Sequence, residues 1–119
     1  MAGIRQKAAE LIEVLDKLSS CIDGIVEQPR SEEWLTEEQR GVLDGLRVSN
    51  RVQRERAEAI ISNKLNRMLS QQQSDEEVAG LQKSIDQYTM LYNNFLGTLA
   101  HARAYNNLQD IRIEGRSVN

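Results

Sequence analysis

The 119-residue chain has one cysteine, one proline and one histidine, and aromatic residues make up only 4% of it. Cys21 has no second cysteine with which to form an intrachain disulfide, and no apolar signal segment follows Met1, so we expect a cytoplasmic protein. No stretch approaches the roughly 18 apolar residues that span a bilayer, and a net charge of −3 gives little reason to expect nonspecific binding to nucleic acid or membranes.

Groups for catalysis or metal binding are equally scarce. His101 lies beside an apolar seam and we expect it to face solvent, where a lone imidazole makes a poor metal site. Cys21 is most simply a small packing residue, and no glycine-rich phosphate loop is present. The sequence therefore predicts a protein that is not an enzyme, with no cofactor, no metal and no small-molecule substrate.

The strongest positive signal is a 3.5-residue hydrophobic repeat, held over about four heptads in the C-terminal half. Its members are Val78, Leu81, Ile85, Tyr88, Tyr92, Phe95, Leu99 and Ala102. A second seam near the N-terminus consists of Ile4, Ala8, Leu11, Leu15, Leu18, Ile22 and Ile25. Each seam places its side chains along one side of a helix, which must be buried against other helices.

Helix-breaking and helix-capping residues between the seams predict three helices. The first runs from about Ile4 to Val26, and Pro29 ends it, while Trp34 and Leu35 are expected to fold over the end of the bundle. Thr36 begins the second helix, which continues to about residue 70, and Ser74 caps the third, which ends near residue 107. We predict an all-α fold, an antiparallel three-helix bundle over residues 1–107. The elongated second and third helices form a coiled-coil-like hairpin, and residues 108–119 are a flexible tail.

Helix lengths suggest a partner-binding surface. Folding the first helix on the second about residues 31 and 32 places residue i near residue 63 − i, so the first helix ends before its neighbours do. The hairpin of residues 60–86 then exposes apolar side chains, unless the helices shift so that the overhang disappears. The expected partner-binding residues are Ile61, Leu65, Met68, Leu69, Leu81 and Ile85.

A second surface is more polar. Arg47, Arg51 and Arg54 lie on one stripe of the second helix, opposite Tyr88 and Tyr92 of the third. These five residues form an arginine–aromatic stacking layer, a half-polar groove for a ligand helix, or an arginine face balanced by acids of the first helix, with the tyrosines in the core. Asn50 and Gln53 lie near positions where a heptad would place core residues.

Two functions follow as hypotheses. The first is a protein–protein interaction module, an adaptor or chaperone that binds an amphipathic helix of another protein. The second is a structural subunit that covers the exposed hairpin by homo-oligomerisation. Leu46 followed by Asn50, the Ile60-Ile61 pair before Leu65, and the run from Ala104 to Asn107 resemble flagellar and type III secretion export chaperones. That resemblance implies binding to the helical terminus of an export substrate.

Overall fold

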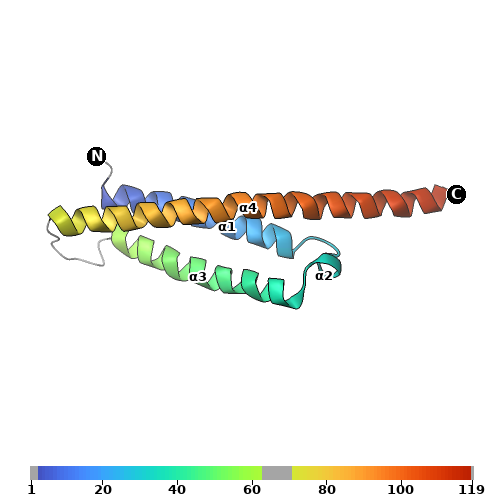
Figure 1. Cartoon of the computed structure of the whole chain (residues 1–119), viewed down its shortest axis with the longest axis horizontal. Helices are drawn as coiled ribbons and strands as arrows, with labels where there is room; N and C mark the ends of the chain where they lie inside the picture. The colour runs from blue at the N-terminus through green and yellow to red at the C-terminus, as the bar shows by residue number, and fades with distance from the viewer. Residues whose placement is uncertain (1–2, 63–70, 119) are drawn as a thin grey trace.

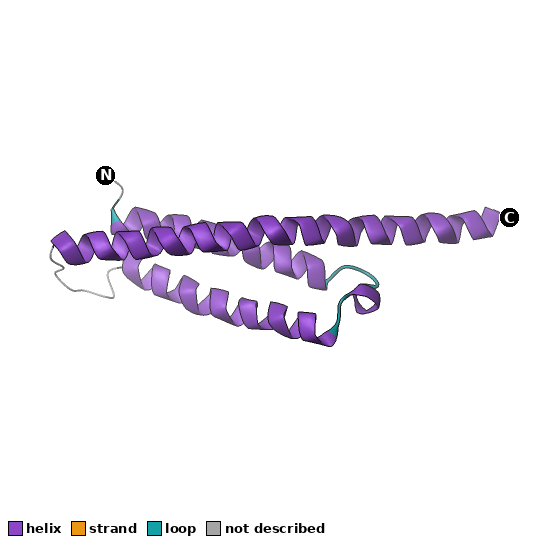
Figure 2. Cartoon of the chain, in the orientation of Figure 1, coloured by secondary structure: helices purple, strands orange, loops and turns teal. Residues whose placement is uncertain are grey.

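All regular elements in the described part of the chain are helices. The computed structural model describes residues 3–62 and 71–118, which form α1 (Ile4–Val26), α2 (Ser31–Trp34), α3 (Glu37–Ile61) and α4 (Gln71–Val118). Figure 2 shows helices throughout the described residues, with short loops on either side of α2. The predicted all-α class is therefore confirmed.

The helix α1 makes most of the contacts between helices. Figure 1 shows α3 running back along α1, α4 running in the same direction as α1, and α3 diverging from α4 toward the end that carries α2. The helix α1 packs closely along both α3 and α4, whereas α3 and α4 scarcely approach each other within the described residues. The result is an elongated molecule of 73 × 26 × 20 Å.

The buried face of α1 is the predicted N-terminal seam. Leu11, Leu15, Leu18, Ile22 and Ile25 are each at most 1% exposed. At about 1.5–3 kcal/mol for each fully covered leucine or isoleucine, this face is the main source of apolar stabilisation. The predicted bounds of this first helix, Ile4 to Val26, are confirmed.

The register between α1 and α3 differs from the prediction. Arg47 pairs with Asp23 and Arg54 with Asp16, so residue i of α1 faces residue 70 − i of α3, seven residues from the expected register. The cause is the connection: Ser31–Trp34 forms a short helix, and α3 begins only after the capping box of Thr36 and Gln39. By this register α1 lies along α3 from about Asp44 to the last described residue of that helix, so the apolar overhang expected of α3 beyond α1 is not found among the described residues.

The ends of α4 also differ from the prediction. Ser74 lies inside the helix rather than at its cap, and α4 continues past Asn107 to Val118. The contacts that hold this extension come from the α1–α2 connection, because Arg30 forms an ion pair with Asp110 at 2.9 Å and its guanidinium donates to Asn106 at 3.4 Å. Gln28 accepts a further hydrogen bond from Asn106. The expected helix end near residue 107 is therefore wrong.

Candidate functional site

Two cavities lie between α3 and α4, one near each end of α3, and we call the surface that contains them the α3–α4 groove. At the end near α2 it contains a cavity of about 260 Å³, lined by Trp34, Leu35, Gln39, Val42, Leu43, Phe95 and Thr98. Five of these seven side chains are apolar, and Val42 is 58% exposed at the rim. A surface of this kind suits the apolar side chains of another helix.

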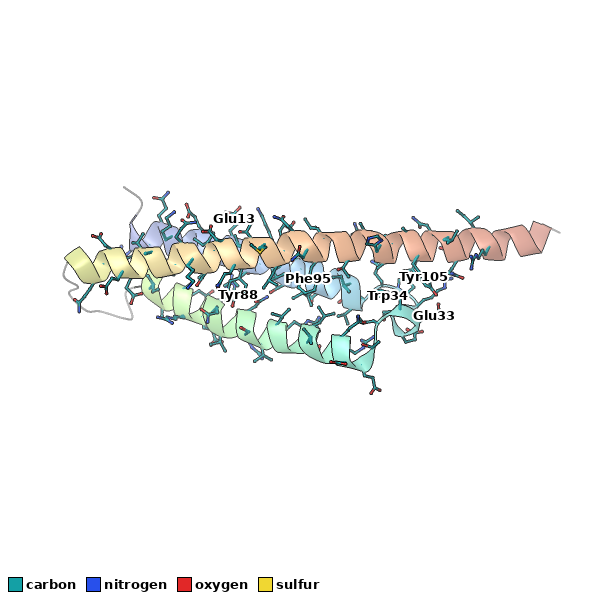
Figure 3. The ribbon with its side chains drawn as sticks, in the orientation of Figure 1. Glu13, Glu33, Trp34, Tyr88, Phe95 and Tyr105 are labelled. Carbon is teal, nitrogen blue, oxygen red and sulfur yellow. The ribbon has the colours of Figure 1, made fainter. Side chains whose placement is uncertain are left out.

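The middle of the groove is lined by larger side chains that are only partly covered. Leu46 of α3 and Leu91 and Phe95 of α4 pack against the core cluster around Ile22 while remaining half-buried. Tyr88 contacts both this cluster and the one around Leu11. Figure 3 shows Tyr88 and Phe95 on the side of α4 that faces α3. The groove is therefore a continuous extension of the core rather than a separate patch.

The opposite end of the groove is polar. A cavity of about 480 Å³ lies there between α3 and α4, with Leu11 of α1 also in its lining. Arg56 lines it from α3 and Glu77 from α4, together with Ile60 and Leu81. An occupying helix would consequently meet apolar side chains near α2 and charges of both signs at this end.

Two buried polar atoms near the groove have no hydrogen-bond partner among the described residues. These atoms are the indole Nε1 of Trp34 and the side-chain Oδ1 of Asn50. Asn50 is 2% exposed, and its amide nitrogen donates to the Ser19 hydroxyl at 3.3 Å. On α3 it lies between Leu43 of one apolar cluster and Ala57 of the other. Unpaired buried polar atoms each cost about 1–3 kcal/mol.

Half of the predicted partner-binding residues lie in the described part of the chain. Leu65, Met68 and Leu69 lie outside the described residues, and Ile61 is 37% exposed at the last position of α3. Ile85 is 9% exposed in the core cluster of α1, and half-buried Leu81 packs on that cluster. The expectation that Ile85 lies open is wrong because this side chain is buried in the core cluster, whereas Leu81 also lines the cavity between α3 and α4.

The predicted polar groove is also divided by the structure. Arg47 and Arg54 turn toward α1, where their side chains bind Asp23 and Asp16, and Arg51 is exposed. Tyr88 and Tyr92 pack instead on the core clusters. The arginines do not face the tyrosines, so the alternative of an arginine face balanced by acids of the first helix describes the contacts.

Arg47 and Arg54 form ion pairs at the surface of the protein. The hydrogen bond to Asp23 raises the pKa of Arg47, and the hydrogen bond to Asp16 raises that of Arg54. Both guanidinium groups are more than a third exposed, so solvent screens each pair and its contribution to stability is small. The two pairs show the register of α3 on α1.

Reactive groups do not converge in the described part of the chain. Burial raises the pKa of the Cys21 thiol, with nearby Arg103 acting in the opposite direction, and the side chain is 5% exposed in the core. His101 is exposed on α4, as expected. Among the described residues no three histidine, cysteine or acidic side chains are grouped to hold a metal ion.

Most residues of the groove, among them Trp34, Val42 and Phe95, were not assigned to a site by sequence reasoning. Trp34 and Leu35 were expected to fold over the bundle end, and both pack on the core cluster there. Val42 gave no signal, because an isolated valine on an exposed helix is ordinary.

Comparisons with known proteins return no match: no protein-family model, no curated protein and no solved structure matches the chain. Within the described residues, none of the helices has the length and apolar character that crossing a membrane requires.

Proposed function

We propose that this chain is a non-enzymatic protein–protein interaction module. In this proposal α1, α3 and α4 act as a three-helix bundle, and the α3–α4 groove receives one amphipathic helix of a partner as the fourth member. The observation that carries the proposal is that α3 and α4 pack on α1 but scarcely on each other, with Phe95 and Trp34 lining the cavity between them.

The groove sets the chemistry of the partner helix. Near α2 the helix would carry large apolar side chains, since Leu35, Val42 and Phe95 line that end. At the other end it would carry polar or charged side chains, because Arg56 and Glu77 line the second cavity. The export-chaperone resemblance makes the helical terminus of an export substrate one such partner.

Site-specific photo-crosslinking tests this function with a matched pair of positions. Val42 and Val52 are both valines of α3 and are 58% and 56% exposed, but only Val42 lines the groove. A photoreactive amino acid is placed at position 42, and the chain is expressed in the organism that carries its gene. Irradiation should then give a covalent adduct with one partner. The same group at position 52 should give none of that adduct.

Adduct identity separates the two hypotheses. An adduct at position 42 with another protein, mapped to an amphipathic helix and lost on Phe95→Asp in a folded chain, supports the module. An adduct at twice 13.5 kDa supports instead a subunit that covers its groove with a second copy. Equal labelling at positions 42 and 52, or none at 42, rejects the groove as the site.

A further inference from the structure

The face of α4 that points away from α1 has almost no charge. Between Asp86 and Asp110 the only Lys, Arg, Asp or Glu is Arg103, whereas 28% of the whole chain is charged. Arg103 does not belong to that face, because it lines a shallow hollow with Asp16 and Cys21 of α1. Solvated helix faces of soluble proteins carry charged side chains, and depletion of charge marks the centre of protein interfaces.

Large apolar side chains stand exposed on the same face. Met90 is 66% exposed, Leu108 48% and Ile111 63%. Gly97 and Ala104 lie between them and are also exposed. Met90, Gly97, Ala104 and Ile111 follow one another at intervals of seven residues, which keeps them on one side of the helix over three heptads, about 32 Å. We call these four residues the outer seam of α4.

The order of sizes along the outer seam is symmetric. A large side chain stands at each end, and the two smallest residues stand in the middle. When two such helices lie antiparallel about an axis between residues 100 and 101, Met90 of one meets Ile111 of the other, and Gly97 meets Ala104. Small residues at the crossing point let the helix axes approach closely, while the large ones pack on either side.

We propose that two copies of this chain associate through the outer seam of α4, antiparallel about a two-fold axis near Ala100 and His101. A face that is complementary to itself in this way is what a symmetric dimer requires. The seam lies on the side of α4 away from α1, and none of its four residues lines either cavity of the α3–α4 groove. The dimer therefore leaves the groove free, and the inference does not depend on the proposed function.

The test is the mass of the purified chain by light scattering, with charge substitutions at the paired positions. The wild-type chain should have about twice 13.5 kDa, and Met90→Lys or Ile111→Glu alone should reduce the mass to 13.5 kDa. The double variant M90K/I111E should recover the dimer, because each lysine then faces a glutamate of the other copy. In a parallel dimer the same changes would place lysine against lysine.

Val52→Lys is the control, since Val52 is similarly exposed on α3, and it should leave the dimer intact. Far-UV circular dichroism checks that every variant stays helical, which is expected because each substituted side chain is more than half exposed. A wild-type mass of 13.5 kDa at high micromolar concentration overturns the proposal. A dimer that persists in both single variants also overturns it, as does a double variant that stays monomeric. Photo-crosslinking at Val42 remains informative in each case.

Discussion

Replacing Asn50 by leucine should stabilise the protein, although the substitution removes a hydrogen bond. Asn50 lies seven residues from both Leu43 and Ala57, and these three are the buried residues of α3. Its Oδ1 is buried without a partner among the described residues, and its one hydrogen bond, to Ser19, is long at 3.3 Å. The position is thus a core position of the heptad occupied by a half-satisfied amide.

Several opposing terms set the magnitude. Removing the unpaired acceptor gains about 1–3 kcal/mol, and covering leucine gains about 1.5–3 kcal/mol. Against this stand about 0.5–1.5 kcal/mol for the lost hydrogen bond and about 1–3 kcal/mol for forcing a larger side chain into the core. The net expectation for Asn50→Leu is a gain of about 1–2 kcal/mol, or roughly 4–8 °C in Tm for a domain of this size.

Thermal and urea unfolding followed by circular dichroism measure this change. Asn50→Ala is the control: it removes the same polar group but leaves a cavity, so it should be less stable than Asn50→Leu. Ser19→Ala in the wild-type background should cost about 1 kcal/mol by leaving the amide nitrogen unpaired. A loss of 1 kcal/mol or more in Asn50→Leu would refute the view that the Asn50 side chain is only half-satisfied. A buried polar residue at such a position commonly fixes the register between two packed helices. In the leucine variant, residues of α1 should therefore crosslink to a wider range of α3 positions than in the wild-type chain.

Three further predictions use separate parts of the structure. Ile22→Ala should destabilise the chain by about 2–5 kcal/mol, measured by urea unfolding, because this side chain is 0% exposed. A double-mutant cycle on Arg54 and Asp16 should give a coupling of about 0.2–1 kcal/mol that shrinks in 1 M salt; coupling unaffected by salt would contradict a solvated pair. The hydrogen bond to Glu33 raises the pKa of Tyr105 above its ordinary value of 10.0, so Glu33→Gln should lower it in a spectrophotometric titration. The stabilisation from this hydrogen bond is fully present below pH 10 and is lost as pH rises through the raised pKa, and an unchanged titration in the variant would contradict the contact.

The helical segments could be read from the sequence because their signals are local. The periodicity of α1 and the capping box at Thr36 depend on residues within a few turns of each other, and the structure has both. The register could not be read in the same way. It depends on Ser31–Trp34 forming a short helix after Arg30, whose φ of 62° is left-handed. No pattern in the sequence marks a non-glycine residue for that conformation.

The candidate site was less accessible to sequence reasoning than the helices. A shift of seven residues preserves every heptad position but changes which residues are covered, so Ile85 moved from the expected surface into the core. The continuation of α4 past Asn107 depends on long-range contacts, above all between Arg30 and Asp110. The groove itself results from the divergence of α3 and α4, which neither seam encodes on its own.

Binding of the dye 1-anilinonaphthalene-8-sulfonate to the purified, folded chain tests most directly whether the α3–α4 groove is an open apolar site. Trp34 is the only tryptophan and lines the cavity, so bound dye should accept energy from it and quench its emission. Val42→Asp should abolish this transfer while Val52→Asp leaves it unchanged, with near-UV circular dichroism showing native packing in both. No transfer in the wild-type chain, or equal loss in both variants, would contradict the account.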